Sequence, residues 1–403
     1  MSTSVLEKIE LAPKDPILGV TEAYNADQNP KKVNLGVGVY TDDNGKVPVL
    51  QCVRAAEQKL SAAPLPRNYL PIDGLAAYDR AVQETLFGAD NSAVKAGRIV
   101  TVQTLGGTGG LKVGGDFLRR INPGADIYIS DPSWENHRAI FEYAGYTVKT
   151  YPYYDPATNG LKFDAMLAAL EQMPAGAIVL LHACCHNPTG VDLSAEQWEK
   201  VISAVNRRKL VPFLDIAYQG FADGLEEDAA TIRRFTAECP AVFVSSSFSK
   251  SLSLYGERVG ALSIVTASKD EALRTLSQLK RVIRTNYSSP PTLGGKAVEL
   301  VLTTPELHKQ WDQELGQMRE RIKVMRKQLV EKVRALRADF DLSFIVKQRG
   351  MFSYSGLTKE QVHRLRDEYS IYAIDSGRIC VAALNSKNID YVAQAIAKVL
   401  VPK

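Results

Sequence analysis

The chain has 403 residues, of which 45% are hydrophobic and 23% are charged, a mixture typical of soluble globular proteins. This length exceeds one ordinary domain and predicts about two. The net charge is only +4, from 49 Lys and Arg against 45 Asp and Glu, which is too balanced for a dedicated nucleic-acid-binding protein. The longest apolar stretch, residues 177–185, is too short to span a bilayer.

The N-terminus and the cysteines indicate the cellular compartment. Glu7, Lys8 and Glu10 stand where a secretory signal needs an apolar core. The five cysteines are an odd set with two adjacent members, Cys184 and Cys185, which predicts neither a disulfide framework nor a metal site. We therefore expect a cytoplasmic protein without a metal, a nucleic-acid partner or a membrane partner, whose cysteines are buried thiols.

Short apolar runs recur in the first two thirds of the chain, each followed by a turn and a segment of helical period. They lie at 99–102, 126–129, 177–181, 211–214 and 241–244. This alternation predicts parallel strands with helical crossovers. Because the loops that follow such strands meet at one edge of the sheet, we expect the polar residues there to converge on a ligand.

The loops after the first two runs contain candidate ligand-binding residues. Residues 106–110 (GGTGG) open a helix expected from about Leu111, and their amides, with the Thr108 hydroxyl, suit a phosphate; a plain glycine turn explains them equally well. Trp134 follows the second run and stacks on a planar ligand or plugs a crevice between domains. His137 alone is more often a structural histidine than a catalytic one.

The next three loops add an amide, an acid and an amine. Asn187 lies in a turn fixed by Pro and Gly, and Asp215 leaves an apolar strand where a buried carboxylate needs a partner. Tyr218 comes three residues later. After the fifth run, Lys250 lies among hydroxyl residues with Arg258 eight positions on, a spacing that combines an amine nucleophile with a phosphate clamp.

From Leu315 the apolar positions step by three or four residues, which predicts one long helix with a buried stripe. The stripe comprises Leu315, Met318, Ile322, Met325, Leu329, Val333 and Leu336. Its Lys-rich and Arg-rich opposite face is interpreted as a solvated surface rather than as a site for RNA or a membrane.

Together these segments resemble the fold-type I, class I aminotransferases that use pyridoxal 5′-phosphate, in the aspartate and aromatic amino-acid subgroup. The stretch 247–260 matches that family's lysine signature throughout, and the likeness extends from about residue 13 to the C-terminus. It is greatest to bacterial tyrosine (aromatic-amino-acid) aminotransferases, through the segments 68–71 (NYLP), 103–107 (QTLGG), 253–258 (SLYGER) and 350–354 (GMFSY).

The resemblance implies an α/β fold with two domains. A large cofactor-binding domain, residues 46–310, would hold a mostly parallel seven-stranded sheet between helices. A smaller α+β domain would combine residues 13–45 with 311–403, and residues 1–12 would form an arm that contacts the partner subunit. The family builds its active site across the interface of a homodimer, so we expect a homodimer here.

The resemblance also assigns roles around the cofactor. Lys250 would form the Schiff base with pyridoxal 5′-phosphate and then move the substrate proton, and Asp215 would hold the ring nitrogen protonated. Tyr218 and Asn187 would bind the phenolic oxygen, and Trp134 would stack on the ring. The phosphate would be bound by Gly107, Thr108, Ser247, Ser249 and Arg258, and by Tyr69 from the neighbouring subunit.

Substrate recognition would depend on two arginines. Arg378 would bind the α-carboxylate, assisted by Asn187 and Trp134, and Arg284 would enter from the other subunit to pair with the distal carboxylate of aspartate or glutamate. Gly38 would lie over the substrate beside Ile17 and Val37, and its small size would leave room for an aromatic ring. The implied activity is transfer of the amino group of tyrosine, phenylalanine or aspartate to 2-oxoglutarate in a ping-pong cycle.

Three alternatives stay open. The chain is an aspartate-specific aminotransferase, another enzyme on the same cofactor such as a β-lyase or a decarboxylase, or a regulatory protein that binds the cofactor without turnover. Retention of both Arg284 and Arg378 favours transamination over the other enzymes, and the set Lys250, Asp215 and Arg258 disfavours the regulator.

Overall fold

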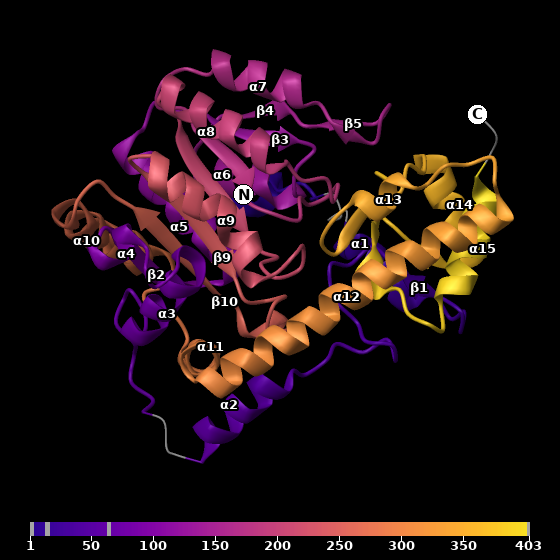
Figure 1. Ribbon diagram of the computed structural model, residues 1–403, viewed down its shortest axis with the longest axis horizontal. Helices are drawn as coiled ribbons and strands as arrows, with labels where there is room; N and C mark the ends of the chain where they lie inside the picture. The colour runs from indigo at the N-terminus through magenta and orange to yellow at the C-terminus, as the bar shows by residue number, and fades with distance from the viewer. Residues whose placement is uncertain (1–3, 13–16, 63–65, 401–403) are drawn as a thin grey trace.

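The computed structural model describes residues 4–12, 17–62 and 66–400. Most of them build a layered α/β part around a seven-stranded sheet (Figure 1). In spatial order the strands are β2 (Ile99–Leu105), β10 (Val259–Val265), β9 (Val242–Ser247), β8 (Val211–Ile216), β7 (Ile178–His182), β3 (Ile127–Asp131) and β4 (Val148–Pro152). Only β10 runs antiparallel to its neighbours within this sheet. The expected mostly parallel sheet is therefore confirmed.

Helices cover both faces of the sheet, because each buried strand is apolar on both faces. On β7, Ile178 and Leu180 pack into one core cluster, and Val179 and Leu181 pack into the other. The first cluster is shared with α5 (Gly106–Ile121), α6 (Glu135–Tyr143) and α10 (Lys269–Asn286). The second is shared with α2 (Gln51–Ser61), α3 (Ala76–Phe87), α4 (Ser92–Lys95), α7 (Phe163–Gln172), α8 (Ala195–Arg208), α9 (Leu225–Glu238) and α11 (Thr292–Thr303).

A second, smaller part combines segments from the two ends of the chain. β1 (Val33–Asn34) pairs in parallel with β12 (Ile371–Tyr372), and β11 (Phe352–Tyr354) pairs antiparallel with β13 (Arg378–Cys380). The helices there are α1 (Leu18–Ala26), α13 (Phe344–Lys347), α14 (Lys359–Tyr369) and α15 (Ile389–Val399). The remaining elements are the hairpin β5 (Tyr154–Asp155) and β6 (Gly160–Leu161), and the 3-10 helices η1 (Val5–Lys8), η2 (Tyr255–Glu257) and η3 (Val381–Ala383).

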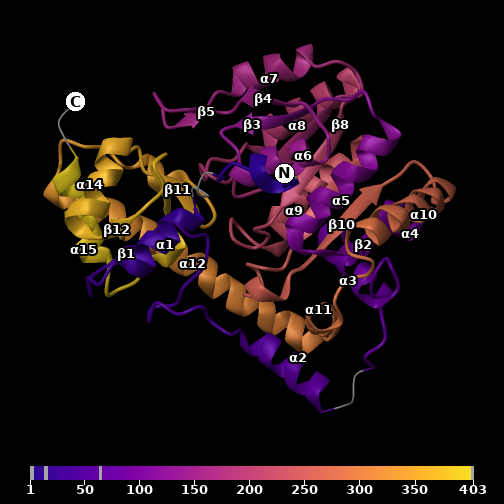
Figure 2. The same cartoon turned by 180° about the vertical axis from the view of Figure 1, so that it is seen from behind.

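The long helix α12 (Pro305–Leu336) connects the two parts, as Figures 1 and 2 show from opposite sides. Its first half packs on α11 and α2, and its second half packs on α15 and α13. The expected stripe from Leu315 to Val333 is buried. Leu336 is the exception, since it is 53% exposed in the last turn of the helix, where the stripe leaves the core.

Two further expectations are corrected. The helix after the first strand begins at Gly106, not near Leu111, because the glycines pack it tightly on the sheet: a Cβ on Gly110 would lie 2.6 Å from the Ser245 hydroxyl oxygen. The apolar runs also omitted β4 and β10. The sequence of β4, VKTYP, is largely polar and leads into β5 rather than into a helix. The sequence of β10, VGALSIV, is apolar and leads into α10, so the run-then-helix pattern was present there and was missed. No helix in the described ranges is long and apolar enough to cross a membrane, and the five cysteines are buried and free.

Gly114 tests how closely α5 packs on the sheet. A Cβ there would lie 2.5 Å from Phe213 Cζ and 3.2 Å from Leu262 Cδ1. Helix propensity favours alanine by about 1 kcal/mol, but overpacking costs about 1–3 kcal/mol. We expect Gly114→Ala to lower the free energy of unfolding in a denaturant titration. Gly124→Ala is the control, because nothing lies within 4 Å of its Cβ position; equal stability of the two variants contradicts the prediction.

Candidate active site

A pocket of about 250 Å³ opens at the carboxyl-terminal edge of the parallel strands, where the two parts of the molecule meet. Its walls come from the loops after the strands, from the N-terminal segment and from the C-terminal part. The lining residues are Ile17, Gly38, Gly107, Thr108, Leu111, Trp134, His182, Asn187, Asp215, Ala217, Tyr218, Ser247, Ser249, Lys250, Tyr255, Arg258, Phe352 and Arg378.

All but two of the predicted site residues line this pocket. The exceptions are Tyr69 and Arg284, the two residues that the resemblance places in the partner's site. The Tyr69 side chain is 96% exposed. Arg284 is exposed in the last turn of α10, where its guanidinium bonds to the Ser288 hydroxyl. Neither residue contributes to the pocket of its own chain.

The acid of the pocket, Asp215, is buried in the central strand β8. Strand alternation turns it toward the same face as Phe213, where α6 supplies His137. His137 Nε2 donates to Asp215 Oδ2 at 2.8 Å, and the Ser133 hydroxyl pairs with His137 Nδ1 at 2.9 Å. Burial alone would raise the pKa of Asp215, but the bond from His137 and the nearby charges outweigh it and hold this pKa below its usual value. The carboxylate is therefore ionised.

The amine of the pocket is Lys250, in the turn directly after β9. Its Nζ lies 5.0 Å from the centre of the Tyr218 ring. Burial lowers the pKa of Lys250 to about 8, a shift that Arg258 reinforces and Asp215 opposes. A substantial fraction of this amine is thus neutral and nucleophilic near physiological pH, unlike that of an ordinary lysine.

A cradle for an anion lies at the start of α5. The helix begins without a side-chain cap, and its Gly106 amide donates to the Arg258 carbonyl at 3.0 Å. Gly107 and Thr108 follow and line the pocket, so their amides are placed to bind a ligand. Ser247 lies beside this turn, since a Cβ on Gly107 would lie 3.3 Å from Ser247 Cβ. Arg258 Nη1 donates to Ser249 Oγ at 3.3 Å, and a Cβ on Gly106 would lie 2.6 Å from Arg258 Nη2. Glycine at 106, with φ of +66°, therefore leaves the arginine room beside the helix end.

Arg378 forms the opposite wall and is only 1% exposed. Its Nη1 donates to Asn187 Oδ1 at 3.3 Å and its Nη2 donates to the Gly36 carbonyl at 2.7 Å. Its Nε is buried without a hydrogen-bond partner within the described residues, and the nearest carboxylate, Glu135, is 4.0 Å away. A buried guanidinium with an unused donor is suited to binding a carboxylate ligand.

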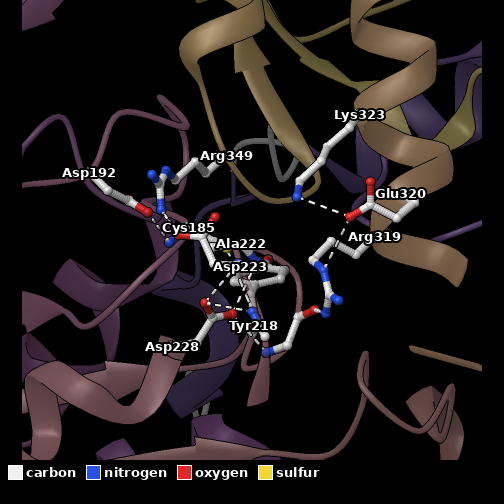
Figure 3. A network of polar contacts seen from close by, with 12 residues as sticks. Cys185, Asp192, Tyr218, Ala222, Asp223, Asp228, Arg319, Glu320, Lys323 and Arg349 are labelled. Carbon is white, nitrogen blue, oxygen red and sulfur yellow. Dashed lines mark hydrogen bonds and ion pairs between the residues drawn. The ribbon is translucent and has the colours of Figure 1, made fainter. Parts of the chain in front are cut away.

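The loop after Tyr218 is held from both parts of the molecule (Figure 3). Asp228, on the first turn of α9, accepts bonds from the amides of Gly220, Ala222 and Asp223 at 2.8, 3.0 and 2.9 Å. Arg319 of α12 donates to the Gly220 carbonyl at 2.9 Å, and Arg349 pairs with Asp223. Burial raises the pKa of Tyr218, so its phenol stays protonated in the pocket.

Gly38 packs against Phe352 at one wall of the pocket. A Cβ on Gly38 would lie 2.5 Å from Phe352 Cζ, and both residues line the pocket. Glycine at 38 therefore leaves the space that the Phe352 ring needs, and room for a substrate ring stays a prediction. Phe352 lay in a segment that carried the family resemblance, but its sequence gave no chemical reason to select it.

Sequence reasoning also missed His182 and the contact of His137 with Asp215. The two histidine rings lie 5.0 Å apart. Burial lowers the pKa of His182 to about 3, so this residue is neutral. The available signal was a histidine within a few residues of a strand end. The pairing of His137 with Asp215 on β8 depends on the order of the strands in the sheet, which sequence spacing does not show.

The residues of the pocket fit one type of ligand. An anion cradle, an amine of lowered pKa and an ionised carboxylate converge from neighbouring loops, together with Trp134, a planar side chain. This set matches a molecule that carries a phosphate, a carbonyl carbon and a basic aromatic ring, as pyridoxal 5′-phosphate does. Arg378 adds a place for the carboxylate of a second molecule.

Comparisons with known proteins agree with this geometry. The family model described as aminotransferase class I and II matches residues 30–396. The chain is 58% identical to an aspartate aminotransferase of Pseudomonas aeruginosa and 49% identical to the aromatic-amino-acid aminotransferase of Escherichia coli, each over 98% of this chain and 100% of the relative. The chain also matches a crystal structure of an aromatic-amino-acid aminotransferase from Burkholderia pseudomallei that is covalently bound to pyridoxal phosphate. The TM-score is 0.97 and the sequence identity 64%, over 99% of this chain and 100% of that one.

The lowered pKa of Lys250 predicts a pH-dependent stability for the ligand-free chain. Between pH about 8 and about 10 the unfolded chain keeps a proton that the folded chain has released, so this group makes stability rise with pH. Below pH 8 the buried charge destabilises the fold. We expect Lys250→Met to be more stable than the wild type at pH 7 by up to about 3 kcal/mol, and the difference to shrink at pH 9.5. Denaturant titrations at both pH values test this, and a difference that does not change with pH contradicts it.

Proposed function

Because the chain belongs to the class I and II aminotransferases, we propose that its pocket binds pyridoxal 5′-phosphate through Lys250 and transfers amino groups between amino acids and 2-oxo acids. The donors are tyrosine, phenylalanine and aspartate, and 2-oxoglutarate is the acceptor in a ping-pong cycle. Relatives named for aspartate, tyrosine and aromatic amino acids support this range. The observation that carries the proposal is the convergence of Lys250, Asp215 and Arg258 in one pocket.

The pocket residues divide the binding of the cofactor between them. The phosphate binds Gly107, Thr108, Ser247, Ser249 and Arg258. Asp215, oriented by His137, pairs with the ring nitrogen, and Tyr218 and Asn187 bind the phenolic oxygen, with Trp134 against the ring. When bound, the cofactor supplies an electron sink for the bond broken at the substrate Cα.

Lys250 moves the proton in this scheme. Its neutral amine would take the proton from the substrate Cα and deliver it to the C4′ carbon of the cofactor. This task needs a pKa near the working pH. The Tyr218 ring lies beneath Lys250 Nζ, and its phenol, which stays protonated, is available to donate to the phenolic oxygen of the cofactor. Because both groups are buried, water is kept from the reacting carbon.

Two arginines select the substrates. Arg378 binds the α-carboxylate, with Asn187 and the Trp134 indole beside it. The buried Nε of Arg378, which has no partner among the described residues, supports this role. Arg284 and Tyr69 reach the site of a partner subunit in a homodimer, a role that their exposure in the single chain supports. Val5, Leu6, Ile9 and Leu11 are exposed apolar residues of the proposed arm, residues 1–12.

The proposed domains keep their boundaries, with residues 46–310 as the large domain and 13–45 with 311–403 as the small one. Residues 1–3, 13–16, 63–65 and 401–403 of these segments lie outside the described residues. The pairing of β1 with β12 supports assigning both ends of the chain to one domain. We keep a cytoplasmic location as part of the proposal.

The direct test mixes cofactor-loaded protein with tyrosine or with aspartate, without an oxo acid, and identifies the product released. We expect 4-hydroxyphenylpyruvate from tyrosine and oxaloacetate from aspartate, one per active site. Product from aspartate alone would assign the chain to the aspartate-specific branch. Pyruvate and ammonia in place of a matching 2-oxo acid would indicate a lyase.

Covalent binding through Lys250 has its own test. After reduction with borohydride, we expect the mass of the bound cofactor on the peptide that contains Lys250, and no label in Lys250→Ala. The same variant loses the general base and is expected to lose transamination by at least about 10³-fold. A label on another lysine would overturn this assignment.

Arg284 is expected to discriminate between substrates by charge. Arg284→Leu removes the partner of a distal carboxylate, so we expect kcat/KM for aspartate to fall roughly 100-fold, while that for tyrosine changes less than about threefold. The matched control is Arg281→Leu, an exposed arginine one turn earlier on α10. An equal loss for both substrates, or a loss in the control, contradicts the role.

A further inference from the structure

Arg326 is a buried charge that the proposed mechanism does not use. It lies in the second half of α12 and is 2% exposed. Within the described residues it makes no ion pair with a carboxylate inside 4.0 Å. A charge in such a place needs compensating hydrogen bonds, because burial in an apolar core is otherwise costly.

Its guanidinium is compensated by one short segment of the chain. Nη2 donates to the carbonyls of Gly350 and Phe352, each at 2.7 Å, and Nε donates to Ser353 Oγ at 3.2 Å. Burial lowers the pKa of Arg326 to about 10, so it remains charged at neutral pH. The planar fork of arginine matches several acceptors at once, which a lysine ammonium cannot do in the same geometry.

The segment held by Arg326 is also fixed to the large part of the molecule. The Arg349 amide donates to the Gly190 carbonyl at 2.7 Å, in the loop that carries Asn187. A Cβ on Gly350, with φ of +78°, would lie 2.5 Å from Cys185 Cβ. The segment is thus enclosed between α12 and the loop after β7.

This segment carries Phe352 into the pocket. The Phe352 ring centre lies 4.3 Å from the guanidinium carbon of Arg378, and the ring meets the Tyr218 ring edge to face at 6.1 Å. The ring also packs against Gly38. The ring therefore covers one face of Arg378 and keeps water from it, which strengthens the attraction of the guanidinium for an anion.

We propose that Arg326 is a positioning residue, whose bonds to Gly350 and Phe352 hold the Phe352 ring against Arg378 and thereby set the affinity of Arg378 for the substrate carboxylate. The inference rests on the proposed role of Arg378. Because every amino-acid and oxo-acid substrate carries that carboxylate, Arg326 acts on all of them alike, in contrast to Arg284, which acts on dicarboxylates alone.

The test measures the Kd of 3-phenylpropanoate, which has a carboxylate and an aromatic ring but no amino group, for the cofactor-loaded enzyme. We expect Arg326→Lys to weaken binding about five- to tenfold, since a single ammonium nitrogen cannot reach all the acceptors that Nε and Nη2 bind. KM for tyrosine and for aspartate should rise by the same factor, with a smaller change in kcat. The control is Arg337→Lys, because Arg337 ends the same helix and donates to the carbonyls of Ala397 and Leu400 at 3.2 and 2.6 Å, away from the pocket.

Two further variants separate the possible failures. Phe352→Leu should weaken binding on its own and should not add to Arg326→Lys, because both act through the same ring; this also tests the proposal if Arg326→Lys folds poorly. Arg378→Lys should weaken binding more than either. If Arg378→Lys has no effect, the proposed carboxylate site is wrong. If it weakens binding but Arg326→Lys or Phe352→Leu does not, or if the two add fully, the role of Arg326 is overturned.

Discussion

The hydrogen bond between His137 and Asp215 is the contact on which the pocket depends. Asp215 lies in the middle of the sheet, where an ionised carboxylate without a donor would be strongly destabilising. The bond from α6, only 2.8 Å long, keeps the acid charged and leaves the pocket one fixed negative charge. That charge favours the protonated form of the nearby Lys250, while burial favours the neutral form. Burial is the larger effect and Asp215 limits it, so the pKa of Lys250 is about 8 rather than lower.

The helix α12 is the second element that the site requires. It packs against both parts of the molecule, and its side chains reach the pocket from outside. The Trp311 indole donates to the Ser251 carbonyl at 2.7 Å, next to Lys250, and Arg319 holds the loop after Tyr218. Because one rigid helix contacts the turn of the amine and the segment of Phe352, it fixes the distance between the cofactor groups and the carboxylate site.

The parts of the site that could be predicted from the sequence are those carried by local motifs. Lys250, Asp215 and the glycines at 106–110 follow apolar runs, and the rule that such loops share one edge was enough to bring them together. Arg378 and Gly38 came only from the family resemblance, since an isolated arginine is usually a surface residue. His137 as the partner of Asp215, and Phe352 beside Gly38, could not be found from spacing. Each depends on which strands and domains become neighbours in the folded chain.

The contacts around the junction of the two parts share a chemical feature. Arg319 and Arg326 bind backbone carbonyls of Gly220, Gly350 and Phe352, and Asp228 binds backbone amides. A carbonyl does not titrate, so these bonds depend on pH only through the guanidinium groups. Exposed ion pairs such as Arg349 with Asp223 contribute little and weaken in salt. The junction therefore depends mainly on hydrogen bonds between charged side chains and the backbone, rather than on exposed ion pairs.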